Sequence, residues 1–386
     1  MRFLRTTSTA RLSALLLGVV ALAAATAAIA LAATRGSVQK PPPKPLARAV
    51  HDALAAPEVA GVMARIKFVN HLIDSSAVTG ANPLLSGASG RLWASSGGRI
   101  RIELQSADGD VQVLSNGKSF LVYDGSSNTA YRGELPRRRQ SRSEPKTDRS
   151  PSVAQIQKAV DEARTHAGSI SGAIPSAVAG RPAYEVRLSP RHGGLIAGAR
   201  MAWDAIRGVP LKAAIYARGD SSPVLELTAT SISFGSVPAS TFAVSPPRGA
   251  KVVDLTARSW TPSGRRAAGL RAVRHALPFK LSAPPRLGGR PRHEVKLIGS
   301  GALVSYGRGL DGLAVIETKA DAQTQAAPLQ GSERGLRLPT VSIGGTTGQE
   351  LPTALGTVVR FSRGDVEYTV LGSLPADVVI AAARAL

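Results

Sequence analysis

The sequence predicts an α+β protein that is built mainly from antiparallel strands and divided into two units. Three observations lead to this fold class. Apolar and polar residues alternate with a period of two in many short segments, which is the pattern of half-buried strands. Successive strand segments are joined by turn residues and not by helices, which indicates an antiparallel meander. Helical spacing occurs in only a few places, and 43% apolar residues in a chain of 386 suffice for a core.

The N-terminal segment has the pattern of an export signal or a membrane anchor. Arg2, Arg5 and Arg11 precede an uncharged apolar run, Leu12 to Thr34. This run exceeds the apolar core of a signal peptide, about 7–15 residues, and can span a bilayer core of about 30 Å. We expect residues 1–36 to be a signal or transmembrane anchor and residues 37–46 a Pro-rich spacer. The rest would be extracytoplasmic at the cell membrane, or secreted if the small residues near Thr34 are a cleavage site.

The first unit, residues 47–255, is expected to begin with a helix and to continue as a meander. Apolar residues between Val59 and Ile73 recur at three- and four-residue steps, which predicts a helix there. Asn116 and Gly117 separate two strand segments, and both tolerate the positive φ of a tight hairpin. Residues 132–152 are predicted to be an irregular loop and residues 153–166 a helix. The predicted strands include residues 91–93, 100–104, 111–114, 183–188, 200–206, 211–217, 224–230 and 231–234.

The second unit, residues 264–386, is expected to be a small α+β domain. A basic helix is predicted over residues 263–276, with Ser263 as its cap. The chain ends in a second helix, with Asp377 in its first turn. Residues 319–348 are polar and are predicted to be a loop. The predicted strands cover residues 294–298, 302–306, 313–318, 357–361 and 366–371.

The charge of the chain favours anionic partners. Lys and Arg number 48 and Asp and Glu 26, so the net charge is 48 − 26 = +22. Such a chain is attracted to an anionic membrane surface or an acidic wall polymer. Solubilising loops are an alternative use of the same charge. No helix-turn-helix, zinc finger or aromatic stacking motif accompanies it, so we expect no nucleic-acid partner.

The sequence offers no pattern that specifies catalysis, a cofactor or a metal. The chain has no cysteine, which excludes disulfides and thiol chemistry. The segment "GRGLDG" from Gly307 has the spelling of a dinucleotide site but is followed by a strand-like segment, which predicts a hairpin turn. The segment "GSISG" from Gly168 follows a predicted helix and not the strand that a nucleophile elbow needs. We therefore expect a protein that is not an enzyme and that binds no cofactor.

Four segments of the first unit, taken in order, carry a family resemblance. They are "SGRLWASSGGRIRIEL" from Ser89, "VQVLSNGKSFLVYDGSSNTAYRG" from Val111, "YEVRLSP" from Tyr184 and "VPASTFAVSPPRGAKVV" from Val237. This series resembles the lipoprotein-localisation-factor-like (LolA-like) superfamily. Its members include periplasmic lipoprotein carriers, actinobacterial lipid-carrying lipoproteins and a sensor that restrains a membrane anti-sigma factor. The resemblance implies a strongly curved antiparallel sheet, a half-barrel, wrapped around helices. The second unit resembles a small uncharacterised domain of exported bacterial proteins.

The resemblance also implies an apolar hollow between sheet and helices, which takes acyl chains in several members. The residues with a compatible alternation are Ile100, Ile102, Leu104, Val111, Val113, Phe120, Val122, Val186, Met201, Trp203, Ile215, Leu225 and Leu227. The same residues could fill a closed core, and this alternative stays open.

Two functional hypotheses follow from the resemblance. The first is a non-enzymatic, membrane-tethered protein that binds membrane lipid or a lipidated protein in the hollow. The second is an envelope-sensing regulator that binds an anti-sigma factor or another membrane protein. The chain departs from the lipid-carrying lipoproteins because it lacks their anchoring cysteine.

Overall fold

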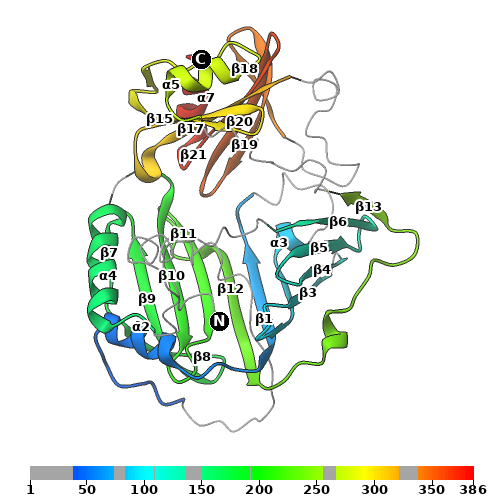
Figure 1. Ribbon diagram of the computed structural model, residues 1–386, viewed down its shortest axis with the longest axis vertical. Coiled ribbons are helices and arrows are strands. Elements are labelled where there is room, and N and C mark those ends of the chain that lie inside the picture. Colours follow the sequence, from blue (N-terminus) through cyan, green and yellow to red (C-terminus); the bar gives the residue numbers. More distant parts are fainter. Residues whose placement is uncertain are drawn as a thin grey trace.

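The computed structural model describes residues 38–73, 83–107, 109–135, 150–191, 193–254, 267–320 and 338–386. They form two sheets, one 13-stranded and one 8-stranded, and Figure 1 shows the second above the first. The first sheet curls into an antiparallel half-barrel that carries helices, so the predicted α+β fold with a curved sheet is confirmed. The predicted anchor, most of the loop at 132–152 and the Ser263 cap lie outside the described residues.

The first sheet consists of two antiparallel meanders, which are joined where β1 pairs with β12, a strand far from it in the sequence. Its order is β13-β6-β5-β4-β3-β2-β1-β12-β11-β10-β9-β7, with β8 also paired to β9. Among the described strands of this sheet, β13 alone runs parallel to its neighbour, β6. The strands are β1 (Gly61–Asn70), β2 (Ala88–Ser95), β3 (Ile100–Ser106), β4 (Gly109–Ser115), β5 (Ser119–Asp124), β6 (Thr129–Glu134), β7 (Ser169–Ile170), β8 (Ile174–Val178), β9 (Arg181–Ser189), β10 (Ile196–Asp204), β11 (Pro210–Ala217), β12 (Pro223–Phe234) and β13 (Lys251–Asp254).

Among the described residues, three α-helices accompany this sheet: α2 (Leu46–Ala55), α3 (Pro83–Ser86) and α4 (Val153–Ala167). The predicted helix over 153–166 is confirmed as α4, and a capping box of Ser152 and Gln155 fixes its start. Helices α2 and α4 lie side by side against β9 and β10, where Ile156 and Val160 share a core with Trp203.

The predicted helix over 59–73 is wrong, because most of that segment is β1. Its side chains alternate: Val62, Ala64 and Ile66 are buried, whereas Arg65 and Lys67 are exposed. Spacings of three and four residues also arise by chance when an apolar strand carries apolar residues on both faces. β1 has strand partners on both sides, β12 and β2, and this pairing overrides any helical preference. The first helix of the described residues is α2, which lies before Pro57.

The second sheet has the order β14-β15-β16-β17-β21-β20-β19-β18. Its helices, α5 (Leu270–Ala276) and α7 (Ala376–Arg384), share one core with it. The "GRGLDG" segment is the predicted turn, with the short helix η4 (Gly309–Asp311) between β16 and β17. The predicted loop over 319–348 is wrong in part, because it contains β18 and the start of β19. The strands are β14 (Arg286–Leu287), β15 (Arg290–Ile298), β16 (Gly301–Tyr306), β17 (Leu313–Lys319), β18 (Thr340–Ile343), β19 (Thr346–Thr353), β20 (Gly356–Arg363) and β21 (Val366–Gly372).

In the part of the chain that the structure describes, backbone hydrogen bonds join the two sheets at two places. The Leu195 N–H, just before β10, donates to the Ser373 carbonyl at 2.7 Å, and the Ala354 N–H donates to the Leu72 carbonyl at 2.8 Å. Gly194 sits in the first contact with φ +74°, and a Cβ there would lie 2.5 Å from the Ser373 oxygen. Only glycine fits this contact without strain.

Candidate functional site

One face of the first sheet is apolar across nearly all of its strands, and the strand register shows this directly. From Met201 on β10, successive cross-strand partners on this face are Ala213 on β11, Leu227 on β12 and Phe68 on β1. From Ala64 on β1, the partners continue through β2 to β5 as Leu92, Ile102, Val113 and Val122. Side chains opposite each other in a ladder share a face, so these rows form one surface, which we call the apolar face.

Every predicted ligand residue lies on the apolar face. The register brings together Ile100, Ile102, Leu104, Val111, Val113, Phe120 and Val122 from β3, β4 and β5, and Val186, Met201, Trp203, Ile215, Leu225 and Leu227 from β9, β10, β11 and β12. The parity of β3, β4 and β5 could be read from the alternation of their residues, whereas β10, β11 and β12 contain register shifts. Whether the face is open or closed depends on what covers it.

At one end of the sheet the apolar face is covered by helices. Val186 and Trp203 are buried in a core with α2 and α4, and Trp203 is only 3% exposed. Near the other end, α3 packs over β1, β3 and β4, and Leu104 and Val111 are buried there. These residues therefore pack against protein. The indole N–H of Trp203 has no hydrogen-bond partner within the described part of the chain.

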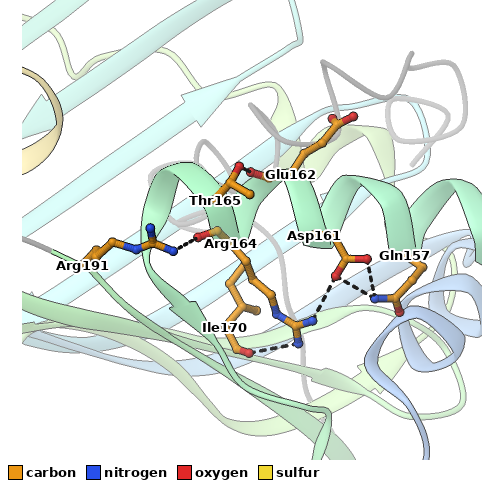
Figure 2. Close-up of polar contacts among 7 residues, drawn as sticks. All are labelled: Gln157, Asp161, Glu162, Arg164, Thr165, Ile170 and Arg191. Atoms are coloured by element: carbon orange, nitrogen blue, oxygen red, sulfur yellow. Dashed lines mark hydrogen bonds and ion pairs between the residues drawn. The ribbon is translucent and has the colours of Figure 1, made fainter.

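Polar contacts at its C-terminal end fix α4 in its covering position (Figure 2). The Arg164 guanidinium donates to Asp161 at 3.1 Å and to the Ile170 carbonyl of β7 at 3.3 Å. Arg191, just after β9, donates to the Arg164 carbonyl at 3.3 Å. A cation at this position satisfies a carbonyl of the last helical turn and complements the helix dipole. The helix is thus tied to both neighbouring strands of the sheet edge.

The remaining predicted residues are half-buried, and four of them, Ile100, Ile102, Leu227 and Met201, pack against the buried cores. Five of them belong to no packed core identified among the described residues: Val113, Phe120, Val122, Ile215 and Leu225. Tyr131 on β6 continues the same row beyond Val122 and is 38% exposed. Tyr131 and Phe68 are not among the predicted residues: the segment around Phe68 also fits helical spacing, whereas the alternation around Tyr131 could be read from the sequence. We call this less covered region the open part of the apolar face.

The Pro-rich segment before α2 is held against the first sheet. The Tyr184 hydroxyl donates to the Pro42 carbonyl at 2.7 Å, and Lys44 pairs with Asp52 of α2 at 2.8 Å. The hydrogen bond to Asp52 raises the pKa of Lys44. Burial alone would raise the pKa of Asp52, but the hydrogen bond and charge of Lys44 lower it. From Pro42 onward, the Pro-rich segment therefore contacts the first sheet and α2.

Within the residues that the structure describes, no group of three or more His, Cys, Asp or Glu could hold a metal ion. No helix in this part of the chain is long and apolar enough to cross a membrane.

Comparisons with family models and with curated proteins find no match. Solved structures similar to this chain include MucB in complex with MucA(peri), at 17% identity and a TM-score of 0.38, covering 87% of this chain and 94% of that one. The MucA/MucB complex of Pseudomonas aeruginosa matches at 17% identity and a TM-score of 0.37, with the same coverage. An uncharacterized conserved protein from Thermus thermophilus matches at 10% identity and a TM-score of 0.34, over 54% of this chain and 98% of that one. At these TM-scores the similarities carry no argument about this chain.

Proposed function

We propose that this chain is a non-enzymatic, membrane-tethered extracytoplasmic protein that binds a lipid or a lipidated partner on the open part of the apolar face. The observation that carries the proposal is the register: apolar side chains from neighbouring strands form one continuous surface, and on several strands they are left half-exposed. Monomeric proteins rarely leave a large contiguous apolar surface uncovered, and such a surface is typical of a binding site.

An acyl chain suits this surface energetically. Each buried methylene contributes about 0.8 kcal/mol, and a micromolar complex needs about 8 kcal/mol. About ten methylenes therefore supply the required free energy before the cost of association is subtracted. The rows from Ile102 to Val122 and from Ile215 to Leu225 present side chains without charge, so an acyl chain lying there leaves no ionised group buried and unpaired.

The test compares two substitutions on neighbouring residues of β5. Val122 and Leu121 are both half-buried but point to opposite faces of the sheet. The chain is extracted from its own membrane, and lipid that remains bound is measured by native mass spectrometry. We expect Val122→Asn to lose bound lipid and Leu121→Asn to keep it, with similar melting temperatures. Trp203→Ser serves as a packing control, because Trp203 lies in the core under α2 and α4.

The alternative hypothesis, a regulator that binds an anti-sigma factor or another membrane protein, gives the same surface a different occupant. Under this hypothesis, the wild-type chain carries no lipid and gains no thermal stability from added phospholipid. In that case Val122→Asn would weaken capture of a membrane protein and leave lipid content unchanged. A wild-type chain without lipid would refute the lipid-binding proposal.

A further inference from the structure

The opposite surface of the first sheet, which we call the outer face, carries charged residues at its centre. On β1 the exposed Arg65 and Lys67 alternate with the buried Ala64 and Ile66. On β2 the exposed Arg91 precedes the buried Leu92. The three cations therefore lie on the outer face of two adjacent central strands.

The register places these cations close together. Arg65 is directly opposite Arg91, and Lys67 is two residues further along β1. Cβ atoms of directly opposite residues are about 4.5–5.5 Å apart, and diagonal neighbours about 7–8 Å. We call Arg65, Lys67 and Arg91 the basic cluster.

The carboxylates nearest in the register have other partners. Glu103 lies opposite Arg91 on β3, but it forms an ion pair with Arg101. On β12, Glu226 pairs with Lys212 at 2.7 Å. Among the described residues, no ion pair or side-chain hydrogen bond engages the basic cluster.

Without a bound anion, the repulsion within the basic cluster lowers the stability of the fold. Like charges directly opposite each other on a sheet destabilise it, and these exposed side chains gain little packing in return. An anion bound between Arg65 and Arg91 would remove the repulsion. Arginine forms two parallel hydrogen bonds with phosphate, and the Ser89, Thr228 and Ser231 hydroxyls beside the cluster are further donors.

We propose that the basic cluster is a contact site for the phosphate headgroups of an anionic bilayer. This inference does not rest on the proposed function, because it concerns the other face of the sheet. Exposed ion pairs contribute little each, so a single free phosphate would be held weakly. A bilayer presents many phosphates at once. After the first contact with the bilayer, each further cation binds a phosphate that is already nearby, which strengthens the overall binding.

The neighbouring row of the outer face fits a bilayer surface as well. Trp93 follows Arg91 by two residues and lies opposite Met63 and Arg101. The Arg101 guanidinium lies 5.5 Å from the centre of the Trp93 ring. An indole beside cations is typical of side chains at the level of lipid headgroups, where one end is apolar and the other wet.

The test uses the full chain and vesicles of phosphatidylcholine with and without phosphatidylglycerol. Binding to phosphatidylcholine alone is the baseline, so that the difference between the two compositions isolates the headgroup charge. We expect the double variant Arg65→Ser/Arg91→Ser to reduce the gain in vesicle affinity that phosphatidylglycerol provides by about 10- to 30-fold at low salt. The melting temperature should stay equal or rise, because the repulsion is removed. Lys118→Ser/Lys251→Ser, which removes two exposed charges elsewhere, is the matched control and should have little effect.

Two results would overturn the proposal. An equal loss in both double variants would show that only net charge matters. A loss of soluble polyphosphate binding without a loss of vesicle binding would assign the basic cluster to a polymer and not to a bilayer. Val122→Asn, which tests the apolar face, should leave the phosphatidylglycerol dependence unchanged, so that failure of one proposal is distinguishable from failure of the other.

Discussion

Replacing Glu317 with Gln should stabilise the second unit at neutral pH. Glu317 lies on β17 and is fully buried in that unit. One carboxylate oxygen accepts a hydrogen bond from the Ser282 N–H at 2.8 Å. The other oxygen has no hydrogen-bond partner among the described residues, and neither has the buried hydroxyl of Tyr306. A buried carboxylate with one satisfied oxygen is costly in its charged form.

The magnitude follows from the pKa. Burial raises the pKa of Glu317 from 4.5 to about 7. The hydrogen bond from the Ser282 N–H lowers the pKa, but its effect is smaller than that of burial. Because the folded-state pKa is the higher one, the folded state binds the proton more tightly. The stabilising contribution is fully present below pH 4.5 and is lost as the pH rises to about 7. At about 1.4 kcal/mol per unit, the shift of 7 − 4.5, about 2.5 units, corresponds to about 3 kcal/mol.

The assay is urea unfolding followed by circular dichroism across this pH range. Glu317→Gln keeps an acceptor for Ser282 and cannot ionise, so its stability relative to wild type should rise by about 3 kcal/mol between about pH 4 and about pH 8. The control is Glu294→Gln, an exposed glutamate of the same unit. If wild type and Glu317→Gln lose stability in parallel with rising pH, Glu317 is not the group responsible and the reasoning fails.

Three further predictions concern the packing of the two units and the N-terminus. Trp203→Ser should lower the free energy of unfolding by about 3–5 kcal/mol, measured by denaturant titration, because it empties a core under two helices. Gly194→Ala should weaken the contact with Ser373, so that calorimetry resolves two transitions and the Leu195 amide exchanges faster; a single unchanged transition would contradict this. N-terminal sequencing of the native protein should find residues 1–36 retained, and a mature start near Ala33 would show that the segment is cleaved.

Much of the fold was predictable because strand alternation is local. The pattern around Ile102, Val113 and Val122 fixes which side chains share a face, and the Asn116-Gly117 turn fixes how β4 and β5 pair. Gly117 adopts the expected positive φ, +82°, whereas Asn116 does not have a positive φ. The same alternation placed all the predicted ligand residues on one face of the sheet. It did not predict how far each of them is covered by other parts of the chain.

The rest depends on contacts between distant parts of the chain. The apolar residues of β1 also fit helical spacing, so the sequence predicts a helix there, and the pairing of β1 with β2 and β12 makes it a strand. The burial of Trp203 depends on α2 and α4, which are distant from it in sequence. The basic cluster likewise exists only in the register that sets Arg65 against Arg91. No local pattern in the sequence indicates that pairing.

The first sheet has several register irregularities, and the one between β1 and β12 keeps its two faces distinct at the centre. The segment was predicted as two strands, residues 224–230 and 231–234, and the structure has one strand, β12, with a bulge. Before the bulge Arg65 pairs with Ser231, and after it Ile66 pairs with Ala229, so Thr230 is the extra residue. The bulge reverses the parity of β12, which lets Ile232 and Phe234 share the apolar face with Leu225, Leu227 and Ala229. Without it, half of β12 would turn its apolar residues to the outer face, beside the basic cluster. A surface for acyl chains and a surface for phosphates can therefore occupy opposite sides of the same strands.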